Sequence, residues 1–235
     1  ELAEELRSLA NLPVYIGNDT RALALAETYL GAAKGCQDFI LVSIHHGTGA
    51  GIISNGQLLL GKNRNVGEIG HIQIDPFGDQ CHCGNFGCLE TLVANKAIVS
   101  QTKALLERGH NSRLDKDNLS IDIICKAALE DDPIATQIIR QTGNHLGRVL
   151  AIMVNLFNPE KILLAGEIVQ SAPVLFPALL QQIQRQSLPN FNRELQLEKA
   201  HFQGQGTMGG YALIKRALHA NDLLQQIMQQ IDDKQ

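Results

Sequence analysis

The sequence lacks two features that would assign it to common functional classes. It has no excess of positive charge, because 20 lysines and arginines face 24 aspartates and glutamates, for a net charge of −4 at pH 7. A chain with this balance has no general electrostatic attraction for nucleic acid. It also has no apolar run of the roughly 18–20 residues that a membrane span needs. We therefore expect neither DNA binding by these residues alone nor insertion into a membrane.

The first residues lack the pattern of a secretory signal. Glu1-Leu2-Ala3-Glu4-Glu5 is acidic where a signal peptide would be basic, which predicts a cytoplasmic protein. The chain has no initiator methionine and opens with the pattern of the middle of a helix, so we expect a piece of a longer protein. There is no long repeat, low-complexity tract or linker rich in serine and proline. With 44% hydrophobic and 19% charged residues, the composition is that of a globular protein.

Helical and strand-like segments alternate along the chain, which indicates an α/β fold. Asn55-Gly56 between short apolar runs predicts a β-hairpin, and the run 161–165, which is apolar after Lys161, is typical of a buried parallel strand. Residues 223–231 keep a helical spacing of apolar residues, which predicts an amphipathic helix suited to a dimer interface. Helices are expected at 1–10, 21–30, 90–158 with a break at 109–118, 174–186 and 208–218, and strands at 14–16, 39–44, 161–165 and 195–202.

Three of the five cysteines, Cys81, Cys83 and Cys88, lie within eight residues, and His71 precedes them by ten. Three thiolates and one imidazole suit a tetrahedral zinc site, and because they fill all four positions the zinc would be structural. Gly84 and Gly87 would let the loop turn tightly around the ion. The alternative is three reduced, packed cysteines.

The other residues near this cluster have simpler interpretations. His82 is expected to lie on the loop surface, turned away from the metal. Cys36 and Cys125 stand alone in apolar surroundings, and we expect both to be small buried hydrophobic residues.

A glycine-rich segment, Gly47-Thr48-Gly49-Ala50-Gly51, lies between two predicted strands. Successive backbone N–H groups without side chains can hold an anion such as a phosphate. Three glycines in a hairpin can equally mark a bulge or a close approach of two backbones. The residues alone do not decide between these alternatives.

Two further segments carry polar groups that suit a binding pocket. Asn18-Asp19 stands where a strand is expected to meet a helix, so its carboxylate is either part of an N-cap or a catalytic base beside a hydroxyl group. Glu68 and His71 can line one polar pocket, with a metal fixing the ring of His71. By contrast, Gly204, Gly206 and Gly209 fit a dinucleotide-binding pattern that lacks the further strand and acidic residue it requires. We expect these glycines to permit close helix packing, or to let the last helix begin near a ligand.

Several of these motifs together resemble the ROK family, named for repressors, open reading frames and kinases. The resemblance covers essentially the whole chain. The most specific residues are those from Val66 to His71, followed by Cys81-His82-Cys83-Gly84-Asn85-Phe86-Gly87-Cys88-Leu89-Glu90-Thr91. The segments 46–56 and 151–159 resemble the sugar-responsive repressors of the family.

The resemblance implies an actin-like, two-lobed fold of RNase H-like units with a sugar in the cleft. On this interpretation, residues 1–35 are a remnant of an incomplete N-terminal lobe that carries the Asn-Asp pair of the cleft. Residues 36–235 form the C-terminal lobe with the zinc loop at 71–90, and the last helices close back on the first lobe. The resemblance also implies that the sugar contacts Asn18, Asp19, Glu68, His71 and Glu90.

Two departures from the kinases of the family favour a regulatory protein. The phosphate loop of the D-x-G-x-T type that precedes this region in the kinases is absent from the chain. Glu167 follows the strand 161–165 where the kinases usually have a run of glycines, and its carboxylate would repel ATP phosphates. The chain is therefore predicted to be the effector-binding and oligomerisation part of a transcriptional repressor of sugar uptake and utilisation genes, and not an enzyme.

The resemblance leaves two inputs open for such a repressor. One is N-acetylglucosamine 6-phosphate, whose phosphate the segment containing Gly47, Thr48, Gly49 and Gly51 would hold. The other is a protein, the glucose-transport subunit of the phosphotransferase system. DNA would be contacted only through a helix-turn-helix domain outside this chain, and we expect a homodimer or homotetramer. The rival hypothesis is an ATP-dependent kinase of glucose or N-acetylglucosamine, with Asp19 as the base.

Overall fold

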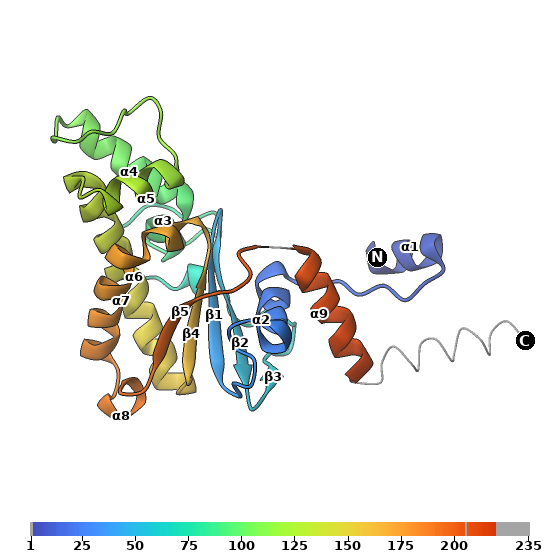
Figure 1. The fold of residues 1–235 in the computed structure, drawn as a ribbon. Helices are drawn as coiled ribbons and strands as arrows, with labels where there is room; N and C mark the ends of the chain where they lie inside the picture. The colour runs from blue at the N-terminus through green and yellow to red at the C-terminus, as the bar shows by residue number, and fades with distance from the viewer. Residues whose placement is uncertain (1, 205, 220–235) are drawn as a thin grey trace, which may run out of the picture.

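A computed structural model describes residues 2–204 and 206–219. Its centre is a mixed sheet in the order β3-β2-β1-β4-β5, in which β1 pairs antiparallel with β2 and parallel with β4 (Figure 1). This mixed sheet with helices on both faces confirms the predicted α/β class. The strands are β1 (Phe39–Ile44), β2 (Thr48–Ser54), β3 (Gln57–Leu58), β4 (Lys161–Ala165) and β5 (Gln196–Lys199).

Helices cover both faces of the sheet. The long α6 (Pro133–Phe157) and α7 (Ala172–Gln186) lie on one face, and α2 (Asp19–Leu30) and α9 (Gly206–His219) lie on the other (Figure 1). The other helices are α1 (Leu2–Ala10), which lies apart from the sheet in Figure 1, and the shorter η1 (Ile69–His71), α3 (Glu90–Val93), α4 (Asn95–Glu107), α5 (Ile121–Leu129), η2 (Glu167–Ser171) and α8 (Pro189–Asn192). Within the described residues, no helix combines the length and apolar character that a membrane crossing requires.

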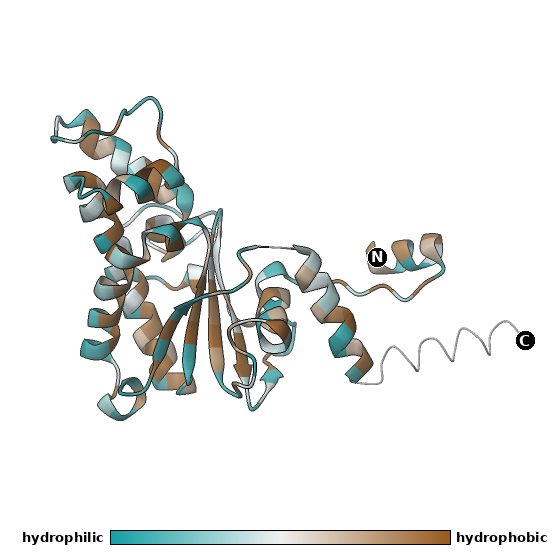
Figure 2. Cartoon of the chain, viewed as in Figure 1, coloured by the Kyte–Doolittle hydropathy of each residue, from teal (hydrophilic) through white to brown (hydrophobic). Residues whose placement is uncertain are grey.

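The two central strands are buried on both faces. Ile40 and Val42 of β1 belong to the core under α6 and α7, while Phe39 and Leu41 belong to the core under α2 and α9. Strand β4 alternates in the same way, as expected for a parallel strand between two helical layers. Figure 2 shows the resulting hydrophobic colouring along the middle strands.

Residues at the helix ends explain where several helices begin and stop. Asn18 is the N-cap of α2, and its side-chain oxygen accepts a hydrogen bond of 3.2 Å from the N–H of Arg21. Asp132 caps α6 and is followed by Pro133 at the first helical position. Asn158 ends α6 in the left-handed conformation, with φ of 44°, and Pro159 follows it.

Some predicted elements differ from the structure. No strand forms at residues 14–16, because this segment does not join the sheet. Strand β2 starts at Thr48, so most of the predicted glycine loop is strand. Gly51 lies beneath α2, where an added Cβ would be 2.5 Å from Ala24 Cβ, so close packing requires this glycine. The predicted hairpin at Asn55-Gly56 is confirmed, with φ of 50° and 72°.

Two predictions about the ends of the chain have no structural test. The predicted helix at 223–231 lies outside the described residues. The predicted lobe boundary between residues 35 and 36 stays a prediction. Helix α2, on the first side of that boundary, packs in one core with β1, β4 and α9.

Candidate functional site

A cavity of about 840 Å³ opens at the carboxyl ends of β1 and β4. This edge of a parallel sheet is where α/β proteins commonly bind ligands. The start of α2, the β1–β2 turn, the cysteine loop, η2 and the segment before α9 form its walls. The lining residues are Asn18, Asp19, Thr20, Ala22, Leu23, Ser43, His45, His46, Gly47, Thr48, Gly49, Glu68, His71, His82, Glu90, Glu167, Gln203, Gly204, Gly206 and Gly209.

The structure brings together all five side chains that the resemblance assigns to a sugar. Asn18, Asp19, Glu68, His71 and Glu90 line this cavity, although they come from three separate segments of the chain. Because Asn18 supplies the N-cap of α2, the carboxylate of Asp19 is not needed for that role. Asp19 Oδ1 accepts a hydrogen bond of 2.7 Å from the N–H of Thr20 and remains on the cavity wall.

Glu68 is held by a buried arginine that sequence analysis did not single out. Arg21 Nη2 donates to Glu68 Oε1 at 2.8 Å, and Arg21 Nε donates to the carbonyl of Val66 at 2.9 Å. Arg21 lies one turn into α2, so it joins the helix that carries Asp19 to the loop that carries Glu68.

Glu90, the first residue of α3, connects the cysteine loop to the glycine segment. Its Oε2 accepts a hydrogen bond of 3.0 Å from the N–H of Thr48, and its Oε1 lies 3.0 Å from His82 Nδ1. The N–H of Ala50 donates to the carbonyl of Gly67 at 2.7 Å. Two N–H groups of the predicted phosphate segment are therefore already used within the protein, and Gly51 is not among the cavity-lining residues.

The predicted metal ligands form one cluster. The ligand atoms of His71, Cys81, Cys83 and Cys88 all lie within 4.8 Å of one another. Cys81 Sγ lies 3.5 Å from His71 Nδ1, and Cys83 Sγ lies 3.7 Å from Cys88 Sγ. A tetrahedral zinc with ordinary bond lengths separates sulfur from nitrogen by about 3.6 Å and sulfur from sulfur by about 3.8 Å. The geometry thus fits the donor set of a closed metal site.

The protein shapes this cluster through its loop conformation. Gly84 and Gly87 have φ of 95° and 61°, which confirms the predicted tight turns. The N–H of Asn85 lowers the pKa of the Cys83 thiol by hydrogen bonding to its sulfur. Desolvation and the neighbouring thiols raise the pKa of Cys88 to about 12, so a metal must displace its proton.

His82 is exposed on the loop surface as predicted, but its ring is not turned away from the site. It lines the cavity, and its ring meets that of His71 edge to face at a centroid distance of 5.0 Å. Position 82 is between two metal ligands, so the turn that gathers the cysteines also directs this ring toward Glu90. Of the two lone cysteines, Cys125 is fully buried as predicted, whereas Cys36 is only half-buried.

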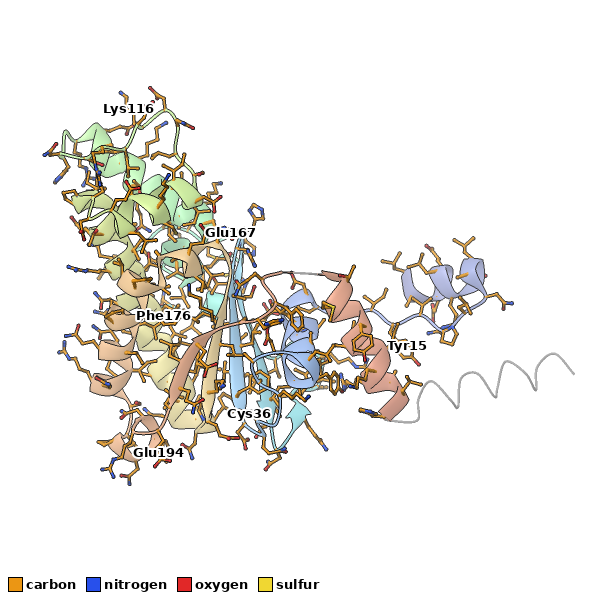
Figure 3. The ribbon with its side chains drawn as sticks, viewed as in Figure 1. Tyr15, Cys36, Lys116, Glu167, Phe176 and Glu194 are labelled. Carbon is orange, nitrogen blue, oxygen red and sulfur yellow. The ribbon has the colours of Figure 1, made fainter. Side chains whose placement is uncertain are left out.

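A second polar cluster, formed by His45, Asn95 and Glu167, lies at the wall of the cavity. Ser43 of β1 pairs with Ala165 of β4, so the next residues in register place His45 opposite Glu167. His45 Nδ1 lies 2.7 Å from Glu167 Oε2, and Asn95 Nδ2 donates to the same oxygen at 2.8 Å. Figure 3 labels Glu167 at the end of the sheet. Its side chain lines the cavity.

The environment of Glu167 favours its ionised form. Burial opposes ionisation, but hydrogen bonds from Asn95, from its own backbone N–H and from His45 hold the pKa of this carboxyl below its ordinary value. Sequence analysis expected Glu167 to oppose ATP phosphates but missed its partners His45 and Asn95. The parallel pairing of the two buried strands 39–44 and 161–165 was the signal that could have identified His45 as the partner of Glu167.

Comparisons with known proteins identify relatives of this chain. The chain is 47% identical over 228 residues to the Escherichia coli K12 protein described as "DNA-binding transcriptional dual regulator NagC", covering 97% of this chain and 56% of that protein. It is 42% identical to the E. coli K12 transcriptional repressor Mlc with the same coverage. A glucokinase of Halalkalibacterium halodurans is 32% identical over 92% of this chain and 67% of that enzyme. The chain therefore spans about half the length of the two regulators.

The fold is shared with a solved regulator of the same type. A crystal structure of a ROK family transcriptional regulator, a homologue of E. coli Mlc, matches with a TM-score of 0.92 and 47% identity. The match covers 97% of this chain and 58% of that one, and confirms the fold that the resemblance implies. The sequence profile described as "ROK family" matches residues 1–217, and the chain belongs to the ROK family.

Proposed function

We propose that this chain is the effector-binding and oligomerisation part of a cytoplasmic transcriptional repressor of sugar uptake and utilisation genes. Repressors at 47% and 42% identity support this class over the glucokinase at 32%. The observation that carries the proposal is the convergence of Asp19, Glu68, His71 and Glu90 on one cavity. Ionised carboxylates are strong acceptors, and a sugar offers hydroxyl donors to match them.

The zinc proposed for the cysteine loop would give this sugar site its shape. His71, Cys81, Cys83 and Cys88 would hold the ion, and its chemistry is structural because the protein supplies all four ligands. The loop ends at Glu90, and His71 belongs to both the cluster and the cavity wall. A bound ion would therefore fix the positions of Glu90 and His71 relative to each other.

The effector that we propose is N-acetylglucosamine 6-phosphate. The segment Gly47, Thr48 and Gly49 lines the cavity and would lie close to the phosphate. The chain would form a homodimer or homotetramer, and DNA would be bound only by a domain outside these residues. The effector would act by binding one state of the oligomer more tightly than the other, because equal affinity for both states shifts nothing.

Isothermal titration of the zinc-loaded chain tests this function. We expect N-acetylglucosamine 6-phosphate to bind, with N-acetylglucosamine weaker and glucose weakest. Binding of no sugar by a folded, zinc-loaded protein would contradict the proposed effector. The glucose-transport subunit of the phosphotransferase system, titrated in the same way in its dephosphorylated form, would then be the input to test.

A sugar kinase is the second candidate function, and the position of Asp19 on the cavity wall favours it. In such an enzyme Asp19 would accept the proton of the attacked hydroxyl. Glu167 opposes this function, since its ionised carboxylate lines the same cavity. ADP release from ATP and sugar, abolished by Asp19→Asn, would establish the kinase and contradict a repressor without enzymatic activity.

A further inference from the structure

The cavity poses a problem for a phosphorylated ligand. Among the described residues that line it, none is lysine or arginine, while Asp19, Glu68, Glu90 and Glu167 bring four carboxylates. A phosphate group carries between one and two negative charges near neutral pH. Among the described residues, only Glu68 of these four has an arginine partner, so a phosphate placed beside the others would be repelled and a sugar phosphate requires a cationic partner inside this cavity.

The glycine segment does not supply enough donors for that role. The N–H of Thr48 is bound by Glu90 Oε2 at 3.0 Å, and the N–H of Ala50 is bound by the carbonyl of Gly67 at 2.7 Å. The hairpin itself uses the N–H of His45, which donates to the carbonyl of Gly47 at 2.9 Å. Three of the six N–H groups of residues 45–50 are therefore already used within the protein.

His45 is held firmly at the edge of the cavity. Its Nδ1 lies 2.7 Å from Glu167 Oε2, and Asn95 Nδ2 donates to the same oxygen at 2.8 Å. The backbone adds a further restraint, since the N–H of Asn95 donates to the carbonyl of His45 at 2.9 Å. The ring therefore has a fixed orientation, with Nδ1 on the carboxylate and Nε2 on the other side.

The other ring nitrogen of His45, Nε2, lies beside Gly204 at the wall of the cavity. Within the described residues, Nε2 makes no hydrogen bond. It faces Gly204, where an added Cβ would lie only 3.6 Å away. Gly204 belongs to the glycine motif that the dinucleotide interpretation could not explain, and its missing side chain leaves Nε2 accessible from the cavity. The side chain of His45 is 31% exposed, which agrees with a group that meets a ligand.

We propose that the Nε2–H of His45, held by Glu167 and Asn95, is the site that binds the phosphate of a phosphorylated sugar. This inference rests on the proposed function and deepens it. With a proton on both nitrogens, the ring and the Glu167 carboxylate would together be neutral, so the pair would remove one carboxylate from the repulsion and present a directed N–H to the phosphate. The specificity for a phosphorylated over an unphosphorylated sugar would then come from a side chain, and not from the glycine segment.

Other titratable groups share the cavity and belong in any test. His46 follows His45 in the same turn. The remaining groups face the cavity from α2, from the loop before η1, from the cysteine loop and from α3: Asp19, Glu68, His71, His82 and Glu90. Of the described histidines that line the cavity, His45 is the one paired with Glu167, so a test that separates His45 from the other histidines identifies the site.

The experiment compares the full, zinc-loaded chain with His45→Gln, which keeps an uncharged N–H donor near the position of Nε2. We expect the affinity for N-acetylglucosamine 6-phosphate to fall by about ten- to a hundredfold. The affinity for N-acetylglucosamine should change far less. His110→Gln, an exposed histidine outside the cavity, is the matched control and should behave as the wild type.

Each result of this comparison is decisive. A wild type that binds neither sugar contradicts the proposed function itself. A wild type that binds both equally leaves the sugar pocket standing but overturns the phosphate site. Retained phosphate selectivity in His45→Gln, or its loss in His46→Gln instead, also overturns the assignment to His45.

Discussion

Arg21 Nη2 donates a hydrogen bond of 2.8 Å to Glu68 Oε1, across a separation of 47 residues in the sequence. The same guanidinium bonds the carbonyls of Val66 and Arg64 at 2.9 Å and 2.5 Å. With only 8% of Arg21 exposed, this fork is a buried link between the start of α2 and the loop before η1. The positions of Asp19 and Glu68, two of the four cavity carboxylates, therefore depend on Arg21, which does not itself line the cavity.

Replacing Arg21 should damage sugar binding without touching the sugar. In Arg21→Gln the carbonyls of Arg64 and Val66 lose charged donors, and Glu68 loses its partner. Because the side chain of Glu68 is half-exposed, we expect the loss of these hydrogen bonds to a charged group to cost about 1.5–3 kcal/mol of folding free energy. We expect a lower midpoint in urea unfolding and a sugar affinity reduced by at least tenfold. Arg64→Gln is the control, because its exposed side chain leaves these bonds intact. Equal behaviour of the two variants would contradict the role of Arg21.

Removal of one thiolate tests the metal site. We expect elemental analysis to find one zinc per chain in the wild type and much less in Cys83→Ser. Because structural zinc sites contribute directly to folding, residues 71–90 should become susceptible to proteolysis and sugar binding should be lost. Cys36→Ser, a half-buried cysteine outside the cluster, should retain its zinc. Absence of zinc from the wild type would leave the packed-cysteine alternative.

Asp132 should give the protein a measurable dependence on acid. Burial opposes its ionisation, but the N–H groups of Ala135 and Arg113 and the hydroxyl of Ser112 hold the pKa of this carboxyl below its ordinary value. Since the unfolded chain binds the proton more readily, the stabilisation is complete above the unfolded pKa of about 4 and is lost as pH falls through the lower folded pKa.

We therefore expect Asp132→Ala to destabilise the protein by about 1–2 kcal/mol at pH 7, the cost of an N-cap. The difference from the wild type, measured by urea unfolding, should shrink below about pH 4. Asp131→Asn is the matched control, because Asp131 is exposed and its φ of 60° suits asparagine. A difference between wild type and Asp132→Ala that is constant down to pH 3 would contradict the role of the ionised carboxylate.

Strong local patterns predicted most of the fold. The buried run 161–165, the Asn55-Gly56 turn and the glycines of the cysteine loop each have one low-energy structure, and the structure agrees with them. The segment 14–16 is apolar and β-branched in part, but a strand also needs an edge to pair with. That requirement is set by the rest of the sheet, so local sequence could not settle it.

The candidate site was predictable where spacing gathers its residues. The cysteines are neighbours in sequence, so their cluster follows from one loop. Arg21 with Glu68, and His45 with Glu167, are 47 and 122 residues apart and meet only because the sheet and α2 bring them together. The contact of His82 with Glu90 was missed because the sequence of a loop does not fix the direction of each side chain.

Glu27 is a fully buried acidic residue of α2, and its replacement tests why this position retains a carboxyl group. Its Oε2 accepts from the N–H of Ala32 at 2.6 Å and its Oε1 accepts from the N–H of Phe202 at 2.7 Å. Both oxygens thus serve as acceptors, one at the end of α2 and one on the segment that leads to α9. In Glu27→Gln one acceptor becomes an NH₂ group that faces a backbone N–H, leaving a buried donor unpaired. We expect a loss of about 1–3 kcal/mol in unfolding free energy. Glu107→Gln, at an exposed end of α4, should have no measurable effect. If Glu27→Gln is as stable as the wild type, a neutral side chain satisfies both N–H groups and the carboxylate is not required.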